Sequence, residues 1–132
     1  MSPTQDLALN AAAVFHLFAS SNDGDLEPMP DLPASVIATG EIWQRGRYWI
    51  HRPEARLTAG IWESGVFRTR PFRFGGDEFF TILEGEIRFE MEGRDPIVVG
   101  AGQSALVPLG ADIVWEQRVP VRKLFMRADP AA

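Results

Sequence analysis

A basic and an acidic side chain, Arg73 and Glu78, flank the Gly75-Gly76-Asp77 turn and form the first candidate for chemistry. The turn lies between two runs of β-type residues, so we expect these side chains on adjacent strands of one hairpin. Buried arginine and glutamate are rare unless paired, and if both face inward they would face each other. Two interpretations stay open. The pair fills the centre of the protein, or Arg73 binds a carboxylate or other oxyanion while Glu78 acts as acid, base or hydrogen-bond acceptor.

Aromatic side chains are the second candidate. Six alternate with polar residues and are therefore predicted core residues first: Trp62, Trp115, Phe72, Phe74, Phe80 and Phe89. Trp115 lies two residues after Ile113, and strand alternation puts both on one inward face. Trp62 and Trp115 can also line a pocket for a small, partly apolar ligand. The predicted ligand-binding set is Arg73, Glu78, Trp62, Trp115, Ile113 and Phe80.

The composition excludes several other kinds of site. The chain of 132 residues has no cysteine, which rules out disulfides, thiolate metal ligands and a cysteine nucleophile. Its two histidines, His16 and His51, stand alone, and a lone histidine is more often a surface or hydrogen-bonded residue than a ligand. The formal net charge of -5 gives no basic footprint for nucleic acid or an anionic membrane. We therefore expect a small-molecule ligand, with no nucleic-acid or membrane partner.

Short runs of β-type residues, separated by glycine and proline, must position these side chains. The predicted strands are residues 36–39, 47–51, 57–63, 66–74, 78–83, 86–92, 97–99, 104–107, 113–117 and 122–127. We predict a turn at 44–46 and another at 75–77, the second closing a hairpin between 66–74 and 78–83. About ten short strands with almost no convincing helix predict an all-β sandwich or barrel.

Length and composition predict one domain with a single core, since 45% of the residues are hydrophobic. We expect the barrel at 35–127, after an N-terminal arm and proline-rich linker at 1–34 and before a C-terminal tail at 128–132. Three prolines and an Asn-Asp-Gly cluster predict no regular element within 21–33. The arm or an apolar outer strand is expected to pair two copies into a homodimer by sheet or arm exchange.

The N-terminal sequence bears on where in the cell the protein is expected. The N-terminus lacks the basic start of a secretory signal, and its apolar run is short and interrupted by His16. No run approaches the roughly 20 apolar residues that span a bilayer. We expect a cytoplasmic protein.

Two spaced sets of residues carry a family resemblance. The first comprises Gly65, Pro71, Arg73, Glu78 and Gly85, and the second comprises Gly102, Pro108, Gly110, Ile113 and Gln117. Their intervals resemble the two sequence motifs of the cupin family. More narrowly, residues 37–126 are similar to the branch that includes ureidoglycine aminohydrolase-like and ethanolamine-utilisation-type cupins. The pieces that carry this likeness are Gly60-Ile-Trp62-Glu63, Glu78, Thr81-Ile-Leu-Glu-Gly85, Pro108-Leu-Gly110, Trp115-Glu116 and Val121-Arg-Lys123.

The resemblance implies a single-domain cupin, that is, a jelly-roll double-stranded β-helix barrel. In metal-dependent cupins, two histidines and a glutamate of the first motif and a histidine of the second bind a divalent ion. By interval these positions are Pro71, Arg73, Glu78 and Ile113. One carboxylate cannot replace three or four ligands, and a neighbouring arginine repels a cation. We therefore predict no metal and no cofactor.

The functional expectation follows from this site without histidines. We predict a protein that binds a small polar metabolite in its barrel, and whether it is an enzyme stays open. The alternative is a non-catalytic regulatory or structural homodimeric module. Lys123, Glu63 and Tyr48 match or neighbour positions that recur in this branch, but the sequence assigns them no role beyond exposed ion pairs.

Overall fold

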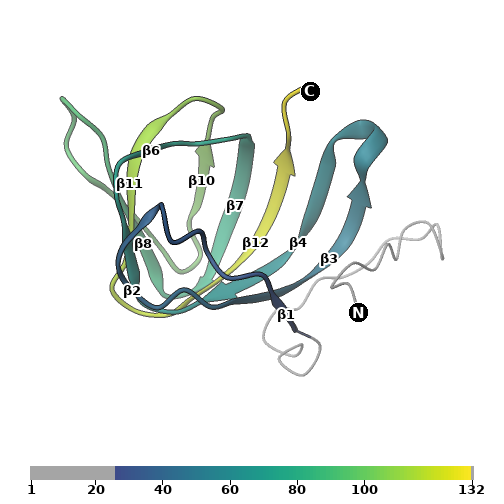
Figure 1. Cartoon of the computed structure of the whole chain (residues 1–132), viewed down its shortest axis with the longest axis horizontal. Helices are drawn as coiled ribbons and strands as arrows, with labels where there is room; N and C mark the ends of the chain where they lie inside the picture. Colours follow the sequence, from purple (N-terminus) through teal and green to yellow (C-terminus); the bar gives the residue numbers. More distant parts are fainter. Residues whose placement is uncertain (1–25, 132) are drawn as a thin grey trace.

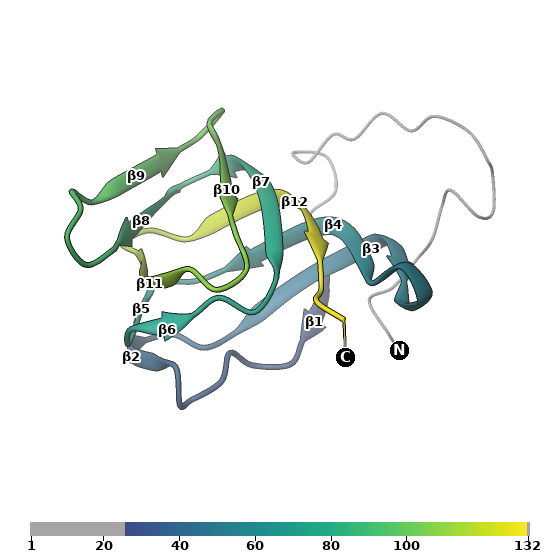
Figure 2. The same cartoon turned by 90° about the horizontal axis from the view of Figure 1, so that it is seen from above.

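The computed structural model describes residues 26–131, which form twelve β-strands and one short 3-10 turn, Pro53–Ala55. The strands make two antiparallel sheets that face each other and curve into a bowl (Figures 1 and 2). The all-β prediction is confirmed. Among the described residues, no helix is long and apolar enough to cross a membrane.

One sheet has the strand order β1-β3-β4-β12-β7-β10. Its strands are β1 (Glu27–Met29), β3 (Gln44–Arg52), β4 (Leu57–Ser64), β7 (Asp77–Glu84), β10 (Ser104–Val107) and β12 (Val121–Ala128). The other sheet has the order β2-β5-β11-β8-β9, with β6 also paired to β11. Its strands are β2 (Ile37–Gly40), β5 (Phe67–Thr69), β6 (Phe72–Arg73), β8 (Glu86–Glu90), β9 (Ile97–Gly100) and β11 (Asp112–Gln117).

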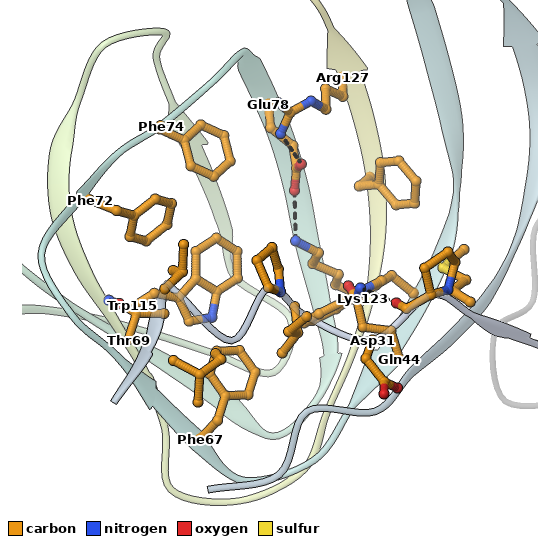
Figure 3. A pocket seen from close by; sticks show the side chains of 18 of the residues that line it. Asp31, Gln44, Phe67, Thr69, Phe72, Phe74, Glu78, Trp115, Lys123 and Arg127 are labelled. Atoms are coloured by element: carbon orange, nitrogen blue, oxygen red, sulfur yellow. Dashed lines mark hydrogen bonds and ion pairs between the residues drawn. The ribbon is translucent and has the colours of Figure 1, made fainter. Parts of the chain in front are cut away.

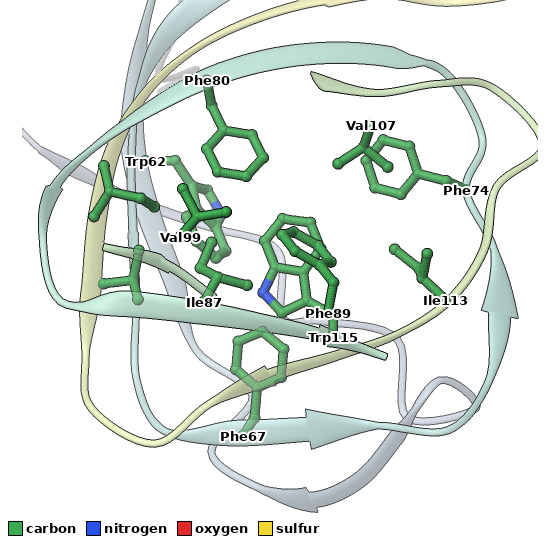
Figure 4. Packing of buried hydrophobic residues seen from close by; sticks show 12 residues of the cluster. Trp62, Phe67, Phe74, Phe80, Ile87, Phe89, Val99, Val107, Ile113 and Trp115 are labelled. Carbon is green, nitrogen blue, oxygen red and sulfur yellow. The ribbon is translucent and has the colours of Figure 1, made fainter. Parts of the chain in front are cut away.

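The core lies between the two sheets and is rich in aromatic rings (Figure 4). Alternation along each strand creates it. In β7, for example, Glu78, Phe80 and Ile82 face inward and are buried. Phe79, which lies between Glu78 and Phe80 in the chain, points to the outer face and is half exposed. Trp115 of β11 lies at the centre, with ring centroids 5.0 Å from Phe89 and 5.9 Å from Phe80. Each sheet therefore contributes rings to one shared aromatic cluster.

The predicted hairpin around residues 75–77 is wrong. β6 pairs with β11 in one sheet, whereas β7 pairs with β12 and β10 in the other. The two glycines of this segment thus connect the sheets instead of turning the chain within one of them. The turn residues show that the chain changes direction, but they do not specify which strands pair across the change.

Two further local predictions are wrong. The predicted turn at 44–46 is the first part of β3, where Gly46 lies opposite Trp62. A side chain at Gly46 would collide with the carbonyl oxygen of Ile61, so this glycine permits close packing of strands. The linker also contains a strand, because Glu27–Met29 pairs with β3. Its Pro28 is tolerated because β1 is an edge strand, which leaves one row of backbone groups unpaired.

The predicted strand at 66–74 is divided into β5 (Phe67–Thr69) and β6 (Phe72–Arg73), and the other predicted strands agree with the observed ones to within a few residues. β8 shows the expected half-solvated pattern, with Ile87 and Phe89 buried. β12 ends at Ala128, one residue inside the predicted tail. Residues 1–25 of the predicted N-terminal arm and linker lie outside the described residues.

Candidate functional site

A cavity of about 530 Å³ lies between the two sheets (Figure 3). Aromatic and aliphatic side chains form most of its wall, including Phe67, Phe72, Phe74, Trp62, Trp115 and Phe125. Its charged or polar lining residues are Asp31, Gln44, Tyr48, Thr69, Glu78, Lys123 and Arg127. A cavity of this size with an apolar wall and a few polar groups is typical of small-molecule sites.

The central polar contact of the cavity joins Lys123 of β12 to Glu78 of β7. Strand alternation points Lys123, Phe125 and Arg127 to the inside, and the pairing of β12 with β7 places Arg127 opposite Glu78. The Lys123 side chain extends along the inner face, and its Nζ donates to Oε2 of Glu78 at 2.6 Å. The two side chains are only 5% and 7% exposed. Charged groups this deeply buried require a partner of opposite charge, and the Lys123 ammonium and the Glu78 carboxylate are partners of each other.

Three aromatic rings surround the same ammonium group. Its Nζ lies 4.5 Å from the ring centroids of Trp62, Phe80 and Trp115. These rings come from β4, β7 and β11, so both sheets build the cage, and their faces attract the cation. Burial lowers the pKa of Lys123, and the Glu78 carboxylate opposes that change. One carboxylate and three rings thus replace much of the water that would surround an exposed lysine.

Arg127 approaches Glu78 from the other side. Its Nη1 lies 3.7 Å from Oε1 of Glu78, and its Nε donates to Oδ1 of Asp129 at 2.8 Å. The guanidinium carbon lies 5.1 Å from the ring centroid of Phe74. With 30% of its side chain exposed, Arg127 is the more accessible of the two cations. Lys123 and Arg127 therefore share the Glu78 carboxylate, and Arg127 has a second acidic partner in the more exposed Asp129.

Glutamine side chains hold the two tryptophans in place. Nε1 of Trp62 donates to Gln44 Oε1 at 2.7 Å, and Nε1 of Trp115 donates to Gln117 Oε1 at 2.9 Å. Gln117 is buried, and its Nε2 donates to the Ser64 hydroxyl and to the Gly65 carbonyl, both at 2.8 Å. The polar edge of each indole is satisfied in this way, which leaves the ring faces free to contact Lys123.

The predicted inward pair of Arg73 and Glu78 is wrong. Arg73 is 74% exposed, and its Nε donates to Asp112 Oδ1 at 3.3 Å on the outside of the protein. Because β6 and β7 belong to different sheets, these two residues are not cross-strand neighbours although they are close in sequence. Phe72 lines the cavity instead of Arg73, as alternation within β6 requires.

The other predicted residues divide into two groups. Glu78, Trp62 and Trp115 line the cavity. Phe80 and Ile113 are buried in the core, where Phe80 contacts the Lys123 ammonium and Ile113 does not border the cavity. Sequence reasoning missed Lys123 and Arg127, and the exposed ion pair expected for Lys123 is wrong. Their spacing in β12, with Phe125 between them, was the available signal, because it places all three on one face.

The residues at the cupin metal positions do not fit a divalent ion. Pro71 offers no ligand, Arg73 lies outside and Ile113 is aliphatic, so Glu78 alone could coordinate. That carboxylate already contacts two cations. Within residues 26–131, no group of three or more His, Cys, Asp or Glu side chains could hold a metal. A transition metal normally needs three or four such ligands.

Comparisons with known proteins agree with this architecture. The family model described as EutQ-like cupin domain matches residues 52–125. A DUF861-family protein of unknown function from Pseudomonas syringae pv. tomato has a TM-score of 0.73 and 20% identity, over 78% of this chain and 44% of that one. This chain thus spans less than half of that protein's length. A search of curated protein sequences found no match.

Two further structures carry the EutQ description. A putative ethanolamine utilisation protein EutQ from Salmonella typhimurium has a TM-score of 0.57 and 18% identity, covering 80% of this chain and 98% of that one. The EutQ protein of Clostridium difficile has a TM-score of 0.54 and 17% identity, covering 76% and 81%. At these identities the likeness shows the fold alone. The predicted single-domain jelly-roll cupin is confirmed, and the ureidoglycine aminohydrolase-like subtype stays a prediction.

A double-mutant cycle tests the buried ion pair. Lys123→Met leaves the Glu78 carboxylate buried beside Arg127 only, so we expect the free energy of unfolding in urea to fall by about 3 kcal/mol. Glu78→Gln should cost a similar amount, and the double variant should cost clearly less than the sum. Arg73→Met, which breaks an exposed pair, is the control and should cost under about 1 kcal/mol. Strictly additive effects of Lys123→Met and Glu78→Gln would contradict the coupling.

Tyr48 lines the cavity, so its titration reports on the surroundings there. The signal can be assigned to it because the sequence contains one tyrosine. Burial raises its pKa above the ordinary 10.0, while Arg127 opposes the rise. The folded state therefore keeps this proton to higher pH than the unfolded state, and Tyr48 lowers the free energy of unfolding as the pH rises above 10.0.

We expect the absorbance of tyrosinate to show a midpoint above 10.0 in the native protein and a higher one in Arg127→Gln. The protein in denaturant provides the reference midpoint. A native midpoint at or below that reference would show that the tyrosine is not buried as described.

Proposed function

This chain belongs to the family of EutQ-like cupin domains, and from that premise we propose that its barrel binds a small, partly apolar metabolite that carries an oxyanion. The proposed binding needs no metal ion. One observation supports it above all: a cavity of about 530 Å³ whose apolar wall encloses the cluster of Lys123, Glu78 and Arg127.

The charges of the cluster favour an anionic group on the ligand. Lys123 and Arg127 both contact the buried carboxylate of Glu78. The other nearby acidic side chains, Asp129 beside Arg127 and Asp31 in the cavity wall, are exposed, so solvent screens their charges more strongly. Arg127 is the better first contact because it is partly exposed and because a guanidinium binds carboxylates through two parallel hydrogen bonds. The Nε of Arg127 donates to Asp129, so the two Nη atoms of Arg127 remain available to Glu78 and the ligand.

The walls favour an apolar body on the same ligand. Phe72, Phe74 and Trp115 border the cavity, and the Phe74 ring stacks on Trp115 at 6.2 Å between centroids. A small carboxylate with an aliphatic or planar portion would place its charge at Arg127 and cover these rings with the rest of its surface. This describes the small polar metabolite expected from the sequence in more detail.

The buried ammonium supports metal-independent binding. In a metal-dependent cupin the glutamate of the first motif contacts a divalent cation, whereas Glu78 contacts Lys123 at 2.6 Å. An added divalent ion would meet two positive side chains and a single shared carboxylate, which disfavours it electrostatically. The protein thus carries a cation of its own at the centre of the barrel. A cytoplasmic location stays part of the proposal.

The alternative function is a regulatory or structural homodimeric module. Its support lies on the outer face of the sheet that contains β12, β7 and β10, where Met126, Phe79 and Leu106 lie side by side. Each of these side chains is at least half exposed. An apolar row of this kind is typical of interfaces, and a second copy of the chain could cover it.

A thermal-shift screen with chelator-treated protein separates these functions. Small carboxylates should raise the melting temperature more than ureides or sugars do, and a concentration a hundred times the dissociation constant adds about 2.7 kcal/mol of stability. Arg127→Gln should abolish the shift, whereas Arg73→Gln, which changes an arginine outside the cavity, should retain it.

Two outcomes would overturn the proposal. The first is a shift that requires Mn, Fe, Ni or Zn, together with stoichiometric metal in elemental analysis of the purified protein. The second is the absence of any shift while sedimentation shows a stable dimer, which would favour the homodimeric module.

A further inference from the structure

The chain has an unusual ratio of arginine to lysine. The sequence contains twelve arginines and one lysine, and that lysine is the buried Lys123. The exposed ion pairs described for this chain all use arginine, as in the contacts of Arg73 with Asp112 and of Arg68 with Glu90. An arginine stays charged under all ordinary conditions, whereas a lysine can lose its proton and then carries a nucleophilic lone pair. Of the two basic residues that border the cavity and contact Glu78, the more deeply buried one is therefore the single lysine, whose side chain can become a nucleophilic amine.

We propose that Lys123 is the nucleophile of a carbonyl-binding site, whose ligand is a small 2-oxo acid that forms an imine with Nζ. The inference rests on the proposed function, because it names the ligand class of the same cavity. Carboxylate and carbonyl groups are adjacent in a 2-oxo acid. Arg127 and Lys123 are likewise close together, since they contact the two oxygens of one Glu78 carboxylate.

Glu78 is placed to move the protons of this reaction. Its Oε2 lies 2.6 Å from Nζ, so it can accept a proton from the ammonium and leave a neutral amine. Nζ then bonds to the carbonyl carbon, and the carbonyl oxygen takes that proton from Glu78, giving a carbinolamine. Nζ passes a second proton to Glu78, which returns it to the hydroxyl group as the carbon–oxygen bond breaks and water leaves. An ammonium and a carbonyl have then become a protonated imine and water, and no oxidant or reductant is consumed.

The surroundings suit both the amine and its product. Burial among Trp62, Phe80 and Trp115 lowers the pKa of Lys123, which makes the neutral amine more accessible. The protonated imine keeps the positive charge of the ammonium, so the three rings and Glu78 continue to stabilise it. Only 5% of the Lys123 side chain is exposed, which limits the access of water that would hydrolyse the imine.

Reductive trapping tests the proposal on the full chain. The protein is incubated with glyoxylate or pyruvate and sodium cyanoborohydride, and the adduct is located by intact-mass and peptide mass spectrometry. Besides Lys123, the only amine is the N-terminal one, which serves as the internal reference. We expect Lys123 to be modified faster than the N-terminus in the native protein, with that preference lost in urea.

Substitutions at Lys123 and Arg127 test the role of each residue in the trapping reaction. Lys123→Arg keeps the charge and should abolish the internal adduct. Arg127→Gln retains the lysine and should slow its modification roughly tenfold, since it removes a charge-assisted hydrogen bond to the carboxylate. Arg73→Gln should react at the wild-type rate. Equal rates in Arg127→Gln and the wild type would contradict the assignment of the carboxylate to Arg127.

Thermal shifts without the reductant distinguish failure of the imine from failure of the binding site. Modification of the N-terminus alone, while glyoxylate, pyruvate or propionate still stabilises the native protein, would overturn the imine and leave the ligand site intact. Modification of the N-terminus alone, with no stabilisation by any of these acids, would overturn both.

Discussion

A buried ammonium held against one carboxylate organises the interior of this barrel. Lys123 and Glu78 are both nearly inaccessible to water, so Lys123 needs the Glu78 carboxylate as its partner, and Glu78 is paired with both Lys123 and Arg127. The contact also links the sheets, because Trp62 and Phe80 of one sheet and Trp115 of the other pack around the same nitrogen. The buried hydrogen bonds of Gln117 fix the position of Trp115 and thereby part of the cage. Packing, charge pairing and the shape of the cavity therefore depend on one contact.

This arrangement explains how a cupin can retain its scaffold while its metal ligands change. Gly85 still adopts a left-handed backbone conformation, and Glu78 still faces the inside of the barrel. A positive charge beside Glu78 comes from Lys123 of β12, on the same sheet. Because that cation is part of the chain, its position follows directly from strand register and does not depend on a complete set of ligands.

Local patterns in the sequence predicted most strands and the inward direction of Glu78, Trp62 and Trp115, because alternation and turn residues act over a few neighbours. They could not predict strand pairing, so Arg73 was assigned to the interior from a hairpin that does not exist. β1 was missed because prolines exclude central strands but not an edge strand. The partner of Glu78 lies 45 residues away in the chain, and no interval within one motif could reveal it.

The ammonium cage can be tested directly by NMR of protein labelled with isotopic lysine, since the chain has one lysine and gives one set of side-chain signals. Rings whose centroids lie 4.5 Å from Nζ should shift the neighbouring methylene protons well upfield of their positions in an exposed lysine. We predict such a shift in the native protein, its loss in urea and its reduction in Glu78→Gln. Methylene signals at ordinary positions in the native protein would contradict the account.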